Sequence, residues 1–234
     1  MNLNNEMTAA RSIEFTMPGL MRDVYLWMLI ALSVTGFTAW TVASSPFLLS
    51  LVLGSRITMW CLLFATIALV WHLSARVDRM SLGAATAMFI IYSVLNGLAM
   101  ASIFIVYTMS SIAGVFFCTA GTFGVMSVYG YFTKTDLTRM GNICLMALLG
   151  IIIATVVNMF LDNTFFDLII AYIGILLFVG LTAYDTQKIR RIAETHDLGA
   201  TDAGQKMAIM GALTLYLDFI NLFLYMLRIF GDRK

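Results

Sequence analysis

The sequence predicts an all-α, polytopic membrane protein, a bundle of seven transmembrane helices with the last helix at its centre. Of the 234 residues, 61% are apolar and only 12% are charged, whereas a soluble domain carries roughly 25% charged residues. Apolar runs long enough for a ~30 Å hydrocarbon core recur along the chain. They are continuous rather than alternating, which favours helices over the strands of an outer-membrane barrel.

Seven apolar runs, separated by short loops, are the expected spans. The first 23 residues mix acids and bases, so they are predicted to form a cytoplasmic N-terminal segment and not a signal peptide. Residues 24–234 then form a single transmembrane domain. The expected spans are 24–43, 57–75, 82–106, 111–132, 142–161, 166–187 and 207–230. No Asp, Glu, Lys, Arg or His occurs between positions 80 and 133, which is too long for one span, so a tight turn is expected near Tyr107–Ser111.

The distribution of Lys and Arg predicts the orientation. These residues gather in the N-terminal segment and in the second, fourth and sixth loops, whereas the alternate loops hold only Arg56. The positive-inside rule therefore predicts a cytoplasmic N-terminus. Seven crossings would put the C-terminus outside, while the basic residues at the end of the chain favour a re-entrant last segment. Both alternatives stay open at the level of sequence.

Asp218 is the only charged residue between Lys206 and Arg228. An acid inside a span is costly and marks a candidate functional site. On a helix it belongs to a polar stripe that recurs every three or four residues. The members of this stripe are Gly211, Thr214, Asp218, Asn221, Tyr225 and Arg228. A helix with such a stripe should face protein or a cavity, which predicts a central position for the last span.

Asp185, near the expected cytoplasmic end of the sixth span, is the second notable carboxylate. The loop between the last two spans is expected to centre near Ala200–Asp202, about equally far from Asp185 and Asp218. An equal helical rise on both arms would bring the two residues to a similar depth. Two touching carboxylates cannot easily both ionise, so they would share a proton. The pair could also attract Ca²⁺, a hard cation. The alternative is that each aspartate is paired with an arginine or capped by hydroxyl groups.

Other residues exclude several functions. No basic patch suits nucleic acid, and the three cysteines show no metal or disulfide spacing. The zinc-protease and serine-hydrolase motifs are missing, and LYL before Asp218 does not match the turn of an intramembrane aspartyl protease, so a non-enzymatic protein is expected. Asp162 and Asp167 flank an outer loop and are expected to be solvated. Small residues spaced by four predict close helix packing at Gly97/Ala101, Ala120/Gly124 and Gly150/Ala154.

Two stretches, GLTAYDTQKI and ALTLYLDFINLFLYMLRIFG, resemble the BAX inhibitor-1 family, and in particular its bacterial inner-membrane branch. The resemblance implies a last helix surrounded by the other six. It also implies a pH-sensitive Ca²⁺ leak gated by two aspartates, which match Asp185 and Asp218. Tyr184, Asn221 and Arg228 lie within the same motifs.

The resemblance is weaker for one further residue, and the sequence and its expected role depart from the family pattern in two respects. Arg76 is the nearest match to an arginine that pairs with the sixth-span aspartate in an open state, with Arg79 as a second candidate. A bacterial member has a second-span glutamate that latches onto the last-span arginine, but here residues 57–75 contain no acid, and Ala65 lies near that place. Arg228 is therefore expected to lack this partner. Because one bacterial relative is regarded as a modulator of a membrane-bound ATP-dependent protease, the alternative function is a non-conducting regulator of such a protease or of a stress pathway.

Overall fold

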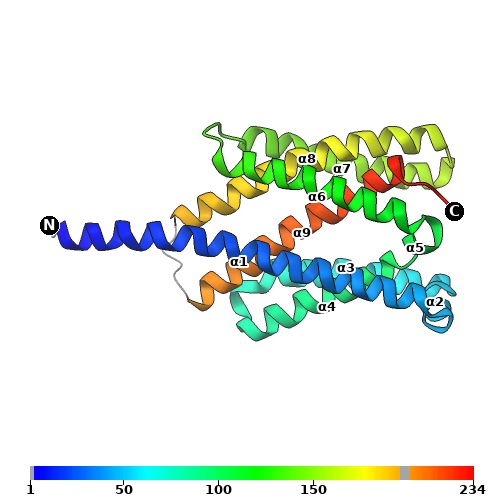
Figure 1. Cartoon of the computed structure of the whole chain (residues 1–234), viewed down its shortest axis with the longest axis horizontal. Coiled ribbons are helices and arrows are strands. Elements are labelled where there is room, and N and C mark those ends of the chain that lie inside the picture. Colours follow the sequence, from blue (N-terminus) through cyan, green and yellow to red (C-terminus); the bar gives the residue numbers. More distant parts are fainter. Residues whose placement is uncertain (1–2, 196–200) are drawn as a thin grey trace. The chain divides into compact units, whose positions relative to one another are not determined.

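The computed structural model describes residues 3–195 and 201–234, and its regular elements are helices (Figure 1). Seven helical segments are long and apolar enough to cross a membrane, which confirms the predicted class. In chain order the helices are α1 (Leu3–Ser44), α2 (Pro46–Leu53), α3 (Arg56–Arg76), the short 3-10 helix η1 (Val77–Arg79), α4 (Leu82–Met100), α5 (Ile103–Val106), α6 (Met109–Phe132), α7 (Thr138–Leu161), α8 (Thr164–Thr195) and α9 (Asp202–Phe230).

Three features of the helices differ from the prediction. The helix that contains the first span begins well before residue 24, because α1 continues without a break through the predicted N-terminal segment. The first loop contains α2, an unpredicted helix that Ser45 caps through its side chain and that Pro46 begins. The third span bends between α4 and α5. The predicted turn near Tyr107–Ser111 is confirmed, since α6 begins at Met109.

The last helix is the most buried of the seven spans. In its most apolar stretch 67% of the residues are buried, against 33% or fewer in each other span, as expected for an enclosed helix. Its 29 residues are continuous and rise about 43 Å, more than a ~30 Å hydrocarbon core requires. The last segment is therefore long enough to cross completely, which favours a full span over the re-entrant alternative. Residues 196–200 of the predicted loop before it lie outside the described residues.

The chain groups into two compact units, so the predicted single transmembrane domain stays a prediction. The first contains Met1–Val106 with Arg191–Leu213. Within it α1 packs against α4, and α3 packs against α4. A Cβ atom added at Gly97 would lie 2.7 Å from the Thr35 carbonyl oxygen, and the Thr35 hydroxyl donates a 2.9 Å hydrogen bond to the Ser93 carbonyl. The expected close packing at Gly97 is thus confirmed.

The second unit contains Tyr107–Arg190 with Thr214–Lys234. In it α8 packs closely against both α6 and α7 (Figure 1). An added Cβ would lie 2.2 Å from the Ala183 carbonyl oxygen at Gly130, and 2.5 Å from the Tyr184 ring at Gly141. Glycine permits this approach because it has no side chain. Both contacts are made by the two residues just before Asp185, so α6 and α7 help to fix the position of this carboxylate on α8.

Candidate intramembrane carboxylate site

Asp185 of α8 and Asp218 of α9 lie together in the second unit. Their side chains are within hydrogen-bonding reach of each other, as the equal-depth argument predicted. Asp185 is 9% exposed and Asp218 is 4% exposed. A hydrogen bond between two carboxyl groups requires a proton on one of them, so the contact can form only when the pair holds at least one proton.

The two carboxylates have little positive charge to balance them. Among the described residues neither one forms an ion pair with Arg or Lys within 4.0 Å, which disfavours the alternative of separate arginine partners. Lys188, one helical turn beyond Asp185, is the nearby cation that acts on that carboxylate through space. From α7, Cys144 lies close enough to both aspartates to interact with their charge. The pair therefore places two acidic side chains together in a buried position with little positive charge nearby.

Three buried polar atoms near this part of α6, α8 and α9 lack a hydrogen-bond partner among the described residues. They are Asp218 Oδ2, Thr186 Oγ1 and Ser127 Oγ. A buried acceptor without a donor costs free energy. Asp218 therefore holds a carboxyl group where stability alone would disfavour one, which is typical of functional sites.

Hydrogen bonds of Gln187 attach the part of α8 that carries Asp185 to the loop before α7. Its Oε1 accepts a 2.9 Å hydrogen bond from the Leu137 backbone N–H, and its Nε2 donates a 2.8 Å bond to the Thr135 carbonyl. One turn further on, Arg190 donates to the Tyr131 carbonyl and lies over the Tyr131 ring. These contacts join α8 to the loop between α6 and α7. They limit how far Asp185 can move while that loop stays in place.

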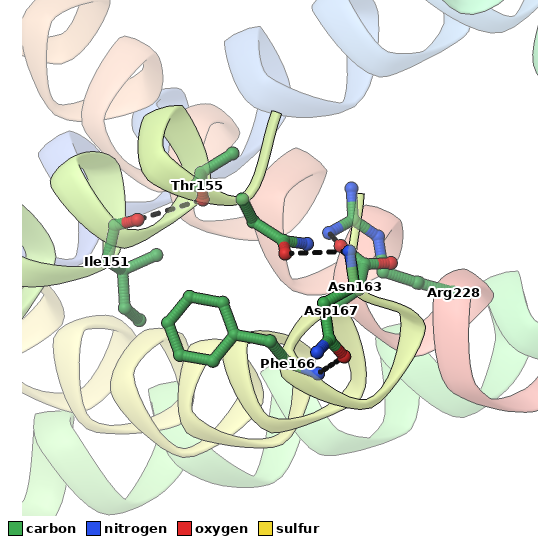
Figure 2. A network of polar contacts seen from close by, with 7 residues as sticks. Ile151, Thr155, Asn163, Phe166, Asp167 and Arg228 are labelled. Atoms are coloured by element: carbon green, nitrogen blue, oxygen red, sulfur yellow. Dashed lines mark hydrogen bonds and ion pairs between the residues drawn. The ribbon is translucent and has the colours of Figure 1, made fainter. Parts of the chain in front are cut away.

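At the other end of the second unit, Arg228 of α9 pairs with Asp167 of α8 (Figure 2). The Nη1 atom of Arg228 lies 2.8 Å from Oδ1 of Asp167. The expectation that Asp167 is merely solvated is therefore wrong. Arg228 lacks the second-span acid, as expected, but Asp167 of α8 is its partner instead. Asp167 lies in the first turn of α8 and Arg228 in the last turn of α9, where each charge is favoured by the dipole of its own helix.

The turn between α7 and α8 brings Asp167 into position. Asp162 ends α7 in the left-handed conformation, with φ at 47°, a conformation that Asp and Asn tolerate better than most residues. Asn163 then caps α8, since its Oδ1 accepts a hydrogen bond from the backbone N–H of Phe166 (Figure 2) and another from that of Phe165. The exposed Asp162 agrees with its expected solvation.

The C-terminal tail lies at this same end of the second unit. The Asp232 carbonyl accepts from the Thr108 N–H at 3.1 Å, and the Asp232 N–H donates to the Ser111 hydroxyl at 2.9 Å. An added Cβ at Gly231 would lie 2.6 Å from the Tyr107 ring. The turn before α6 therefore meets the chain just after α9, which is consistent with a last helix that crosses completely.

The remaining predicted site residues make other contacts or belong to the first unit. Asn221 donates a 2.8 Å bond to the Leu217 carbonyl of its own helix. The Tyr184 ring packs against Gly141, with Lys188 6.0 Å from its centre. Arg76 ends α3 in the first unit and is exposed, so its pairing with Asp185 stays a prediction.

A resident metal would need ligands beyond the two aspartates. The described residues contain no group of three or more His, Cys, Asp or Glu side chains that could hold an ion. Ca²⁺ in proteins takes six to eight oxygen ligands. Two carboxylates suit a transient cation that keeps part of its hydration shell better than a tightly bound one.

Comparison with known proteins agrees with this architecture. Residues 17–234 match the family model described as inhibitor of apoptosis-promoting Bax1. The chain is 50% identical over 214 residues to the inner membrane protein YbhL of Escherichia coli K12, covering 92% of each chain. It is 40% identical to a protein of Borreliella burgdorferi, over 90% of each chain, and 40% identical to protein RP147 of Rickettsia prowazekii, over 92% of this chain and 89% of the other. Because these matches extend over nearly all of the sequence, the chain belongs to the BAX inhibitor family.

Proposed function

We propose that this protein is a pH-sensitive cation leak pathway of the bacterial inner membrane, with Ca²⁺ as a permeant ion and Asp185 and Asp218 as its gate. The observation that carries the proposal is the pair of buried carboxyl groups in mutual reach, without an arginine or lysine ion-paired to either of them among the residues that the structure describes. A shared proton would hold α8 and α9 together, and its loss would place two negative charges side by side. Two such charges repel each other and attract a cation.

The location and orientation are part of the proposal. The similarity to an inner membrane protein of E. coli supports the inner membrane, and the distribution of basic loops supports a cytoplasmic N-terminus. Chemistry on a substrate is not part of the proposal.

The Arg228–Asp167 pair supplies a second constraint on the same two helices. Along α9, Asp218 and Arg228 are ten residues apart, or about 15 Å of helix. A pathway that follows the polar stripe of α9 would pass from the carboxyl pair to this ion pair. We propose that the ion pair holds the far ends of α8 and α9 together, in the place of the second-span acid that this sequence lacks.

Ca²⁺ flux in liposomes tests the proposal. The full-length protein is reconstituted around a Ca²⁺ indicator, and flux is measured over a range of pH for the unaltered protein, Asp185→Asn and Asp218→Asn. Asp162→Asn is the matched control, because it removes a carboxylate at an exposed turn of the same unit. We expect the unaltered protein and the control to show pH-dependent flux, and both pair variants to lose the pH dependence.

Two outcomes would overturn this function. If the unaltered protein shows no flux above empty liposomes, it does not conduct, and the alternative of a non-conducting regulator of a membrane-bound protease or stress pathway would gain support. If flux occurs but neither pair variant changes its pH dependence, the aspartates are not the gate. Co-purification from native membranes in mild detergent would then search for the protein partner.

A further inference from the structure

A largely apolar pocket of about 570 Å³ lies in the first unit, on the membrane-spanning surface of α3 and α4. Its lining residues come from the end of α2, from one face of α3 and from α4. They are Leu53, Arg56, Met59, Trp60, Leu62, Leu63, Thr66, Asn96 and Ala99. Only Arg56, Thr66 and Asn96 among them are polar. The volume lies within the range of ~300–1,000 Å³ that is typical of small-molecule sites.

The pocket faces the surroundings of the protein, since its walls are largely exposed. Arg56, Met59, Trp60, Leu63 and Ala99 are all exposed, and only 11% of the most apolar stretch of α3 is buried. At membrane depth such a surface meets lipid rather than water. An apolar hollow there is filled by acyl chains unless protein covers it.

The length of the pocket matches one leaflet. Along α3 the lining runs from Arg56 to Thr66, ten residues apart, which is about 15 Å of helix. Half of a ~30 Å hydrocarbon core is also about 15 Å. The groove therefore extends from one membrane interface to the middle of the bilayer, with the charged residue at the interface.

The charge of Arg56 has no acidic partner in this region. The sequence contains no Asp or Glu between Asp23 and Asp78, and none between Asp78 and Asp136. Among the described residues no carboxylate lies within ion-pairing distance of the Arg56 guanidinium. An anion from outside the chain would satisfy it, and a guanidinium binds phosphate oxygens in a bidentate manner. Asn96, half-buried and bonded through Nδ2 to the Tyr92 hydroxyl, is a further polar group inside the pocket.

We propose that this pocket binds an anionic phospholipid, with one acyl chain along α3 beside Trp60 and the headgroup phosphate on Arg56. The site lies wholly in the first unit, so it is independent of the carboxyl pair in the second. Each part of the site matches one part of the ligand: the apolar walls match the chain, the length matches a leaflet, and the unpaired guanidinium matches the phosphate.

Quenching of Trp60 fluorescence by brominated lipid tests the proposal. The full-length protein, with Trp27, Trp40 and Trp71 replaced by Phe, is reconstituted in phosphatidylcholine containing a small fraction of phosphatidylglycerol with brominated chains. The same fraction of brominated phosphatidylcholine is the reference lipid. Trp71, which is 76% exposed on the same helix but outside the pocket, gives the matched control when it is the only Trp retained.

We expect the quenching of Trp60 by brominated phosphatidylglycerol to correspond to a local concentration of this lipid about fivefold above its share of the bilayer. One basic residue near an anionic headgroup provides an attraction of this order. Trp71 should show no enrichment. Arg56→Gln should abolish the enrichment and Arg56→Lys should retain part of it. Ala99→Phe fills the pocket at an exposed position, so it should abolish the enrichment while Arg56 remains.

The proposal would be overturned if the two brominated lipids quenched Trp60 equally in the protein that retains Arg56. Lipid would then be bound without recognition of its headgroup. Enrichment that survives both Arg56→Gln and Ala99→Phe would assign the preference to another part of the protein. Quenching of Trp60 by both lipids below that of Trp71 would mean that protein, such as a second copy of the chain, covers the pocket, and this result would also overturn it.

Discussion

Arg228 Nη1 lies 2.8 Å from Asp167 Oδ1, so the last turn of α9 is joined to the first turn of α8 by an ion pair. The two side chains are 35% and 34% exposed. A pair of this exposure is screened by its surroundings, and its contribution to stability is on the order of 1 kcal/mol or less. Its main importance is geometric, because it connects the two helices that carry the carboxyl pair.

A double-mutant cycle measures this connection. Asp167→Asn and Arg228→Gln, alone and together, should show a coupling free energy of about 0.5–1 kcal/mol in unfolding experiments in detergent. Each single substitution should also raise Ca²⁺ flux, because the far ends of α8 and α9 are then no longer joined. Asp162→Asn, at an exposed position five residues before Asp167, should change neither quantity. Additive single effects would show that the two residues do not interact.

The sequence predicted a similar depth for the two aspartates of the carboxyl pair, but it did not predict this ion pair. The approach of Asp185 and Asp218 follows from a simple count along a helical hairpin, because the rise per residue is the same on both arms. The position of Asp167 depends instead on the left-handed Asp162 and the cap by Asn163, which sequence pattern does not establish. A signal was available: an acid in the first turn of one helix and a base in the last turn of the next suit each other electrostatically.

The close contacts of glycine residues were also only partly predicted from the sequence. Spacing by four predicted close approach at Gly97, which is confirmed, and at Gly124 and Gly150, where an added Cβ would meet nothing within 4 Å. The two glycines that matter most for the site, Gly130 and Gly141, stood in no such pair. Which glycine faces a neighbour depends on the rotation of each helix, and a weak apolar periodicity in lipid leaves that rotation unspecified.

Gly130→Ala tests the packing that holds Asp185. An added Cβ would lie 2.2 Å from the Ala183 carbonyl oxygen, and backbone at this distance cannot rotate away as a side chain could. We expect a loss of about 1–3 kcal/mol in the free energy of unfolding, as for other overpacked cores. Gly124→Ala on the same helix should be neutral or stabilising by up to ~1 kcal/mol, since alanine favours the helix. Equal stability of the two variants would contradict the close approach of α6 and α8.

Gln187→Leu tests the attachment of α8 to the loop between α6 and α7. The substitution removes the partners of the Leu137 N–H and the Thr135 carbonyl, and the unsatisfied N–H of the buried Leu137 costs roughly 1–3 kcal/mol. We expect a lower unfolding temperature and faster proteolytic cleavage within residues 133–137. Lys188→Leu, at the exposed neighbouring position, is the control and should leave the cleavage rate unchanged. Unchanged cleavage in both variants would show that Gln187 does not restrain the loop.

Asp218→Leu distinguishes a functional carboxylate from a structural one. Asp218 Oδ2 is buried and receives no hydrogen bond from the described residues, so an apolar side chain of similar size removes a desolvated acceptor. At a pH where the pair has lost its shared proton, the substitution also removes the repulsion between Asp218 and Asp185. At that pH we therefore expect a higher unfolding temperature together with the loss of pH-dependent flux, the trade-off that is typical of residues kept for function. Asp162→Asn, which removes a carboxylate but tolerates the left-handed conformation of that turn, is the control and should leave flux unchanged. If Asp218→Leu instead unfolds the protein at a lower temperature, the carboxylate stabilises the contact between α8 and α9, and its role is structural.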